Sequence, residues 1–442
     1  MKKLFTIAMF LCIGTIFSQA PTLTLVNSYT LTPNSVDTIG AFARIYYHTP
    51  RNKFYVIYAA RPANSGLPSG QLTNFAWREY DATMNFTGNK GTLPSQTGAG
   101  DFAMVMVDST YYHITLASPT ANYKITKYDD NFTVLSSKTI TLNACSSNID
   151  QELNYTNNRL IIGAMYESNI CPPVNPPSPT MTPQSEILQY DLNLNALTST
   201  TILSQNKVTW GASMIFNAGN YYEITMDNFN NRDLYAYKYD ANFNYVNKTL
   251  LHSDGQWSQG VLWNNGYYYV AHHTGEHNRG NVLIGIYDNN WTLQNTTTVT
   301  AFAVPCNTCG TSYNANRPFL MLKGNNLYVS YDIEKYTNWV NAKDWQAGVK
   351  VYQINTPPNH VIELDDKSEI NVFPNPSNGV FQITTTNGKF ISYIVETIYG
   401  QLISKGEGKL IDIRNQPEGI YFYTILNNQG IPTKKGQLVN TK

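Results

Sequence analysis

The 442-residue sequence predicts an all-β protein in which a six-bladed β-propeller precedes a small C-terminal Ig-like β-sandwich. Composition is the first reason, because 32 tyrosines and only 14% charged residues favour strands and turns over long helices. The second reason is a motif repeated along most of the chain, and the third is a change of composition near residue 356. Thirty basic residues balance thirty acidic ones, so we expect no nucleic-acid partner.

Residues 1–20 have the features of a secretory signal peptide. Lys2 and Lys3 precede an apolar run, and Ser18 and Ala20 form a small-residue cleavage site. No later stretch approaches the roughly 18 apolar residues of a transmembrane helix. We therefore expect no transmembrane segment, and export into an oxidising space.

A Tyr-Asp motif divides residues 21–355 into blades. Its copies are YDATMN (80–85), YDDNFT (128–133), YDLNLN (190–195), YDANFN (239–244) and YDNNWT (287–292). They lie 48 to 62 residues apart, near the 40–50 residues of a propeller blade. We expect a turn at each copy, in which the aspartate accepts turn amides, Asn takes a left-handed conformation and the apolar residue starts the next strand. Calcium binding by these aspartates is the alternative. They are Asp81, Asp129, Asp191, Asp240 and Asp288.

A second hairpin precedes each motif, as in GVLWNNGYYYVAHH (260–273), so each repeat contains four strands, A to D. The last repeat stops after its third strand, at residues 352–355. We expect residues 23–26 to supply its fourth strand and so to close the propeller.

The long B–C and D–A loops of a propeller share one face, where we expect the ligand to bind. Four tryptophans fall on this loop face and are candidate ligand-binding residues: Trp210, Trp257, Trp339 and Trp345. Their rings would stack on sugars or contact a protein, and packing between loops is the alternative.

Four cysteines follow the signal peptide and are compatible with two disulfides. Cys145 and Cys171 would join across a Pro-rich insertion, and Cys306 and Cys309 would form a local disulfide. A redox pair would require a helix N-terminus, and a zinc site would require a second pair of ligands.

The segment 273–277 has the H-x-x-E-H pattern of an inverse zincin, so His273, Glu276 and His277 are candidate metal ligands. That chemistry requires a helix, whereas the neighbouring glycines indicate a loop, and solvated loop histidines are the default expectation. We expect no cofactor, with Ca²⁺ or Zn²⁺ as the alternatives. The sequence contains no G-x-S-x-G elbow and no sialidase-type S-x-D-x-G-x-T-W box. It therefore favours a protein without enzymatic activity.

Residues 356–368 are predicted to be a linker and 369–442 a separate domain. This domain contains FPNPSNG (373–379), IYGQLI (398–403) and IDIRNQPEGIYFYTI (411–425), and it ends at Lys442. In this order the elements resemble the type A C-terminal sorting domain of the type IX secretion system of Bacteroidetes. The closing strand is more polar than in that family, and Gln401 replaces a common Lys. The residues that match the family motif are Pro374, Asn375, Pro376, Gly379, Gly400 and Gly419, which we expect to be structural.

The resemblance implies passage through the periplasm and an outer-membrane translocon, then release or attachment at the cell surface, with the type IX machinery as partner. For the propeller, the sequence favours a glycan- or protein-binding module. The alternatives are a polysaccharide-active hydrolase or lyase, with carboxylates at the channel mouth, and a scaffold of surface machinery.

Overall fold

The computed structural model describes residues 20–31, 37–38, 43–62, 74–93, 103–116, 122–141, 146–148, 153–166, 184–197, 201–203, 208–226, 233–274, 280–302, 311–337, 341–355, 370–385, 392–397, 402–426 and 432–441. Their regular structure is all β, as predicted. None of these residues belongs to a helix long and apolar enough to cross a membrane. The chain separates into two compact units, Met1–Pro357 and Pro358–Lys442.

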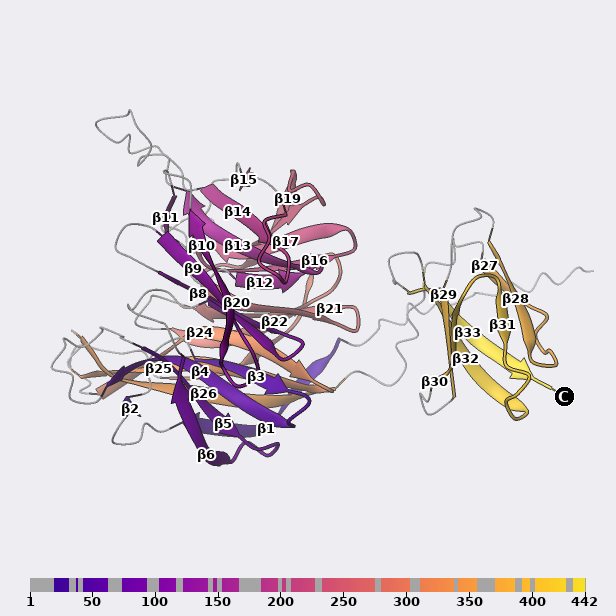
Figure 1. Ribbon diagram of the computed structural model, residues 1–442, viewed down its shortest axis with the longest axis horizontal. Helices are drawn as coiled ribbons and strands as arrows, with labels where there is room; N and C mark the ends of the chain where they lie inside the picture. Colours follow the sequence, from indigo (N-terminus) through magenta and orange to yellow (C-terminus); the bar gives the residue numbers. More distant parts are fainter. Residues whose placement is uncertain are drawn as a thin grey trace, which may run out of the picture. The chain divides into compact units, whose positions relative to one another are not determined.

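Within the described residues, the first unit contains six antiparallel sheets, the blades of a propeller (Figure 1). Blade 1 has β2 (Asp37–Thr38), β3 (Arg44–His48), β4 (Lys53–Pro62), β5 (Asn74–Tyr80) and β6 (Phe86–Thr92). Blade 2 has β7 (Ala103–Val107), β8 (Thr110–Leu116), β9 (Asn122–Tyr128) and β10 (Val134–Thr141). Blade 3 has β11 (Ser146–Asn148), β12 (Leu153–Thr156), β13 (Arg159–Tyr166), β14 (Gln184–Tyr190) and β15 (Thr201–Leu203). Blade 4 has β16 (Val208–Asn217), β17 (Asn220–Met226), β18 (Leu234–Tyr239) and β19 (Tyr245–His252); blade 5 has β20 (Gly255–Asn264), β21 (Tyr267–Thr274), β22 (Asn281–Tyr287) and β23 (Leu293–Thr298); blade 6 has β24 (Thr311–Lys323), β25 (Asn326–Thr337), β26 (Asn341–Asn355) and the N-terminal β1 (Thr22–Leu31).

The N-terminal strand completes the last blade. β1 pairs antiparallel with β26, from Thr22 opposite Asn355 to Leu31 opposite Ala347. Because the first strand of the chain lies in the same sheet as the last three propeller strands, the ring of blades is held closed by backbone hydrogen bonds.

The innermost strands β3, β7, β12, β16, β20 and β24 surround the centre of the propeller. Neighbours contact one another from β7 through β12, β16, β20 and β24 to β3. Between β3 and β7, Arg44 Nη1 and the Tyr46 hydroxyl donate to the carbonyl of Met104 at 3.0 and 2.7 Å. These two polar side chains therefore link the inner strands of blades 1 and 2.

Short A–B turns join the inner strands to the second strands. Asp108-Ser109, Asn157-Asn158, Ala218-Gly219 and Asn265-Gly266 all have positive φ at both positions. This is the type I′ geometry, whose twist matches that of the flanking strands. We call the end of the propeller that carries these turns the turn end, and the opposite end the loop end.

The Tyr-Asp motifs form the C–D turns, as predicted. In each copy one oxygen of the aspartate accepts the backbone N–H groups two and four residues later, for example those of Asn242 and Asn244 on Asp240, at 2.8 and 2.9 Å. Asp81, Asp129, Asp191 and Asp288 make the equivalent bonds. The aspartates are thus turn formers.

The prediction of a left-handed Asn in these turns is wrong, because the apolar residue takes that conformation. The positive φ belongs to Met84, Phe132, Leu194, Phe243 and Trp291, with values from 59° to 66°. All five side chains are buried. Trp291 lies parallel to Tyr268 of its own blade, with ring centroids 4.0 Å apart, and also packs on Tyr222 of the preceding blade. Burial between two blades offsets the cost of a left-handed backbone at a bulky residue.

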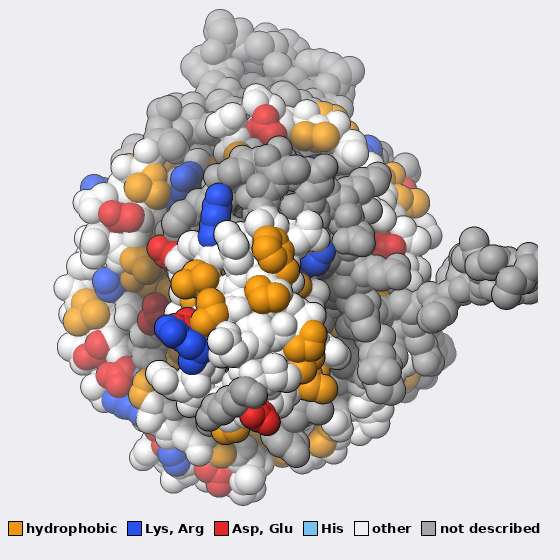
Figure 2. Space-filling model, turned by 90° about the vertical axis from the view of Figure 1, so that its right-hand side faces the viewer, with side chains coloured by type: hydrophobic (Ala, Val, Ile, Leu, Met, Phe, Trp, Pro, Cys, Tyr) orange, Lys and Arg blue, Asp and Glu red, His pale blue; other side chains and the backbone are white. Residues whose placement is uncertain are grey.

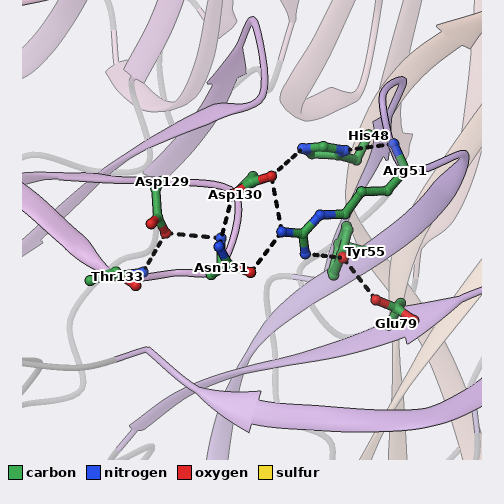
Figure 3. Close-up of polar contacts among 8 residues, drawn as sticks. All are labelled: His48, Arg51, Tyr55, Glu79, Asp129, Asp130, Asn131 and Thr133. Carbon is green, nitrogen blue, oxygen red and sulfur yellow. Dashed lines mark hydrogen bonds and ion pairs between the residues drawn. The ribbon is translucent and has the colours of Figure 1, made fainter.

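A polar cluster also joins blades 1 and 2 at the turn end (Figure 3). Arg51 donates to Asn131 at 2.6 Å and lies 2.9 Å from the carboxylate of Asp130, which is 3.6 Å from buried His48. Its guanidinium also reaches the hydroxyl of Tyr55. Since these groups bind one another across the blade boundary, we interpret the cluster as structural.

The second unit is a β-sandwich, as predicted. One sheet contains β27 (Ile370–Phe373), β28 (Val380–Thr385) and β31 (Leu410–Asp412), and the other contains β29 (Ser392–Glu396), β30 (Leu402–Glu407), β32 (Gly419–Leu426) and β33 (Pro432–Asn440). Phe381, Val395, Ile425 and Leu438 are completely buried in its core. Alternation of apolar residues along each strand builds this core.

Candidate functional site

Three of the predicted ligand-binding tryptophans lie at the loop end of three consecutive blades. Trp210 is near the start of β16, Trp257 near the start of β20, and Trp345 is opposite Glu334 in the β25–β26 pair. All three positions belong to strand segments next to the D–A or B–C loops. Trp339 lies outside the described residues.

Irregular strand pairing marks this end of the propeller. The β16–β17 register shifts between Val208 and Ser213, and the β20–β21 register shifts between Gln256 and Gly260. Trp210 and Trp257 fall inside these two irregular stretches. Bulges of this kind are common next to binding sites, because they change the direction of a side chain and interrupt the ladder.

The candidate metal ligands are only partly described. His273 lies on strand β21 and is fully buried, so the expectation of a solvated loop histidine is wrong for this residue. Its ring lies against Gly280, where a Cβ would come within 1.8 Å of Nε2. Glu276 and His277 lie outside the described residues, and among the residues that are described no three His, Cys, Asp or Glu side chains are placed to hold a metal ion.

The four cysteines predicted to form disulfides also lie outside the described part of the chain: Cys145, Cys171, Cys306 and Cys309. Both disulfides therefore stay predictions.

Two further histidines, His272 and His113, are buried and were not predicted as site residues, although His272 is adjacent to the candidate ligand His273. His272 is 1% exposed and its ring is 4.8 Å from that of His252, centroid to centroid. The pKa of His272 is lowered to about 3, mainly by burial and in smaller part by the neighbouring His252 and His273. Burial, with a smaller contribution from Arg44, likewise lowers the pKa of His113 to about 3. Both rings are neutral at pH 7.

A cavity of about 550 Å³ lies between the six inner strands. Its walls carry Val105, Met106, Tyr155, Ile215, Phe216, Leu262, Trp263, Phe319 and Met321, together with Asn154, Thr156, Ser213, Asn217 and Arg44. Trp263, at the turn end, is 45% exposed. Arg44 is the one charged residue among the described residues of the lining, and no Asp or Glu occurs among them.

Several polar side chains of this lining bind the edges of neighbouring inner strands. Asn154 and Thr156 accept the N–H groups of Met214 and Phe216 at 3.0 and 2.8 Å. Inner-strand edges have no further strand to pair with, so these side chains take the place of a ladder. The remaining wall of the cavity is mainly apolar.

Arg44 is 3% exposed and lies where blade 1 meets blades 2 and 6. Burial lowers the pKa of its guanidinium, while Tyr46 and Asp332 oppose that shift. Asp332 accepts the N–H of Ala43 at 3.0 Å and lies 3.4 Å from Arg317. A guanidinium is therefore held inside the propeller by its neighbours rather than by solvent.

In the second unit, Asn375 of the predicted motif binds the last strand, β33. The Asn375 side chain donates to the carbonyl of Gln437 and accepts the N–H of Val439, at 2.6 and 2.8 Å. Gly379 has φ of 93°, and a Cβ there would lie 2.7 Å from the Cα of Arg414. Pro374 and Pro376 flank Asn375, Gly419 begins β32 with φ of 153°, and Gly400 lies outside the described residues.

Charge is mixed on one face of the molecule. On the face drawn in Figure 2, basic and acidic side chains are interspersed and hydrophobic side chains occur in small separate groups. This pattern agrees with the zero net charge of the sequence.

Comparison with known proteins identifies the second unit. Residues 371–439 match the secretion system C-terminal sorting domain. The chain therefore carries a type IX sorting signal, which directs it to the cell surface or the medium. No curated protein matches the sequence.

The chain is similar to several solved structures, among them a GH43 protein and two neuraminidase-like proteins. A mutant of the GH43 protein BlXynB from Bacillus licheniformis has a TM-score of 0.39 at 10% identity, over 76% of this chain and 85% of that one. The subtype N10 neuraminidase-like protein of A/little yellow-shouldered bat/Guatemala/060/2010 has a TM-score of 0.43 at 8% identity, over 75% and 100%. The subtype N11 neuraminidase-like protein of A/flat-faced bat/Peru/033/2010 has a TM-score of 0.46 at 6% identity, over 77% and 97%.

Proposed function

We propose that the propeller of this type IX cargo is a binding module for an extracellular glycan, with its ligand surface at the loop end. The observation that carries the proposal is the position of Trp210, Trp257 and Trp345 at one end of three consecutive blades. Indole rings present flat apolar faces, together with an N–H donor, and such a surface suits the ring of a sugar. The alternative hypothesis is that the same tryptophans bind a protein.

Binding is better supported than glycan cleavage. Glycoside hydrolysis generally requires two carboxylates about 5–9.5 Å apart across the scissile bond. The described lining of the central cavity contains no Asp or Glu, and its one charged residue is Arg44. Polysaccharide hydrolase or lyase activity therefore has no group of acids in the described channel to support it.

A glycan array and polysaccharide gel-shift assays with the mature full-length protein test the proposal. We expect selective binding that falls at least about tenfold in Trp210→Ala and Trp257→Ala, which is the effect of removing an interface hot spot. The matched control is Tyr245→Ala, an exposed aromatic on the outer strand β19, and it should bind like the wild type.

Metal content and reducing-end release should be measured on the same preparation. Binding without product, and without stoichiometric metal, supports a glycan-binding module. Release of sugar product, or no glycan binding together with stoichiometric zinc or calcium, overturns the proposal. In the second case the histidine segment at 273–277 becomes the site to mutate. Tryptophan variants that bind glycan as tightly as the wild type also overturn it.

A further inference from the structure

The central cavity differs chemically from the loop end and suits a ligand of another kind. Its volume of about 550 Å³ lies within the usual 300–1,000 Å³ of small-molecule sites. Half-buried apolar side chains of blades 2 to 6 form most of its described wall: Val105, Met106, Tyr155, Ile215, Phe216, Val261, Leu262, Phe319, Met321 and Leu322. An apolar molecule in the cavity would bury this surface.

Polar side chains of the wall are bound to neighbouring strands. Asn154 and Thr156 accept N–H groups of strand β16. Asn217 donates to the hydroxyl of Tyr268 in blade 5, at 2.7 Å. Because these groups are used within the protein, a ligand rich in hydroxyl groups would lose hydrogen bonds to water and gain few in return.

Arg44 is likewise bound by its neighbours. Its guanidinium donates to the carbonyl of Met104 at 3.0 Å and lies over the ring of Phe319, 5.2 Å from the centroid. It also interacts with the hydroxyl of Tyr46 and with buried Asp332. The charge of the guanidinium therefore needs no anion in the cavity, and the described lining contains no Asp or Glu that would bind a cation.

Aromatic rings line the cavity along its length. Tyr155, Phe216 and Trp263 each lie close to the A–B turn of their blade, whereas Phe319 lies further from its own turn. Trp263 is also 45% exposed, so the mouth of the cavity is at the turn end. About 10 Å of strand β20 separates Trp263 from Gly260, which lines the deep end, at the usual rise of a strand. This depth accommodates a molecule longer than a single aromatic ring.

We propose that the central cavity is a second binding site, for one uncharged small molecule built mainly of rings, which enters at the turn end and packs between Trp263 and Phe319. Contacts between rings add attraction to the burial of apolar area. An acid or an amine would lose its hydration without gaining an ion pair, because the guanidinium of the wall is already engaged. The site does not depend on the glycan surface at the loop end, and either proposal can fail without the other.

Fluorescence titration of the mature full-length protein with N-phenylnaphthylamine tests the site, because this uncharged probe becomes fluorescent when it leaves water for an apolar site. Anilinonaphthalene sulfonate has the same ring system and one negative charge. We expect one N-phenylnaphthylamine per chain, and binding at least about tenfold weaker for the sulfonate, since its charge would be buried without a partner. Equal affinity for the two probes, or no binding of the uncharged probe, overturns the proposal.

Two variants locate the site. Trp263→Ala removes the ring at the mouth and should weaken binding of the uncharged probe at least about tenfold. Met321→Trp fills the cavity and should abolish binding. The matched controls are Tyr245→Ala and Leu135→Trp, which remove or add a ring on the exposed outer strands β19 and β10 and should bind like the wild type.

The urea midpoint of each variant separates loss of binding from loss of the fold. Because the side chain of Trp263 is 45% exposed, we expect Trp263→Ala to unfold at nearly the same urea concentration as the wild type. Undiminished probe binding in Trp263→Ala, binding retained in Met321→Trp, or an equal loss in the two controls would mean that the probe binds elsewhere, and would overturn the proposal.

Discussion

Acidification from pH 7 to pH 5 should destabilise the propeller through its buried histidines. His113 and His272 have a pKa of about 3 in the folded protein, against about 6.5 in an unfolded chain. At pH 5 the unfolded chain binds a proton on each ring, and the folded protein does not. The contribution of the two neutral rings to the free energy of unfolding is therefore complete above the pKa of the unfolded chain, about 6.5. This contribution is lost as the pH falls below that value, until the folded rings also protonate near pH 3.

The magnitude follows from the difference in pKa. Between pH 7 and pH 5, each ring fully buried in the folded state should lower the free energy of unfolding by about 2 kcal/mol, so the two together account for about 4 kcal/mol. His48, whose pKa is lowered by burial and by Arg51, acts in the same direction. Asp81 lies outside this window, since its pKa is about 2.

Equilibrium urea unfolding at pH 7, 6 and 5 measures the effect. All seven tryptophans precede residue 356, so their fluorescence reports on the propeller and not on the sorting domain. His113→Gln and His272→Gln should each remove about half of the loss between pH 7 and pH 5, whatever each substitution costs at pH 7. A wild-type free energy of unfolding that stays constant from pH 7 to pH 5, or two variants that keep the full loss, would refute the reasoning.

Three further predictions concern core packing, a turn and the hydrogen bonds that hold strand β33. Phe243→Ala should lower the free energy of unfolding by about 3–5 kcal/mol in the same urea assay, because it leaves a cavity beside Tyr221, whose ring lies 4.3 Å away. Asp240→Ala should lower the urea midpoint with an unchanged slope, since two turn amides lose their acceptor; a midpoint equal to that of the wild type would contradict the role of the motif. Asn375→Ala should speed amide hydrogen exchange in β33 by about tenfold, by removing two bonds to that strand, while exchange in the propeller stays constant.

The repeat could be predicted from sequence because its determinants are local. Aspartate binding to amides two and four residues later depends only on neighbours along the chain, and so does the A–B turn at Asn265-Gly266. The left-handed Trp291 could not be predicted in this way. Its backbone strain is offset by packing against Tyr222 of the preceding blade, and that contact exists only after two repeats stack.

The central cavity could not be predicted from the sequence for a similar reason. Arg44 stands at the start of the strand RIYYH and looks like an ordinary surface residue at a strand end. It becomes part of a lining only when six inner strands, each from a different repeat, meet around one axis. The neighbouring glycines indicate a loop at His273, whereas the structure places this residue on strand β21, where its ring is buried against Gly280. The family motif around Asn375, in contrast, was readable because its residues are contiguous.

Closure of the propeller by β1 has a kinetic consequence. Asn355 donates to the hydroxyl of Thr24 across 331 residues of sequence, and the whole β1–β26 ladder joins similarly distant partners. Contacts of such high sequence separation form slowly, because the chain between them must first be ordered. The N-terminal segment thus has no sheet partner until the last propeller strand has been synthesised. For an exported chain, the delay leaves β1 unpaired during early translocation and makes ring closure one of the last steps of folding.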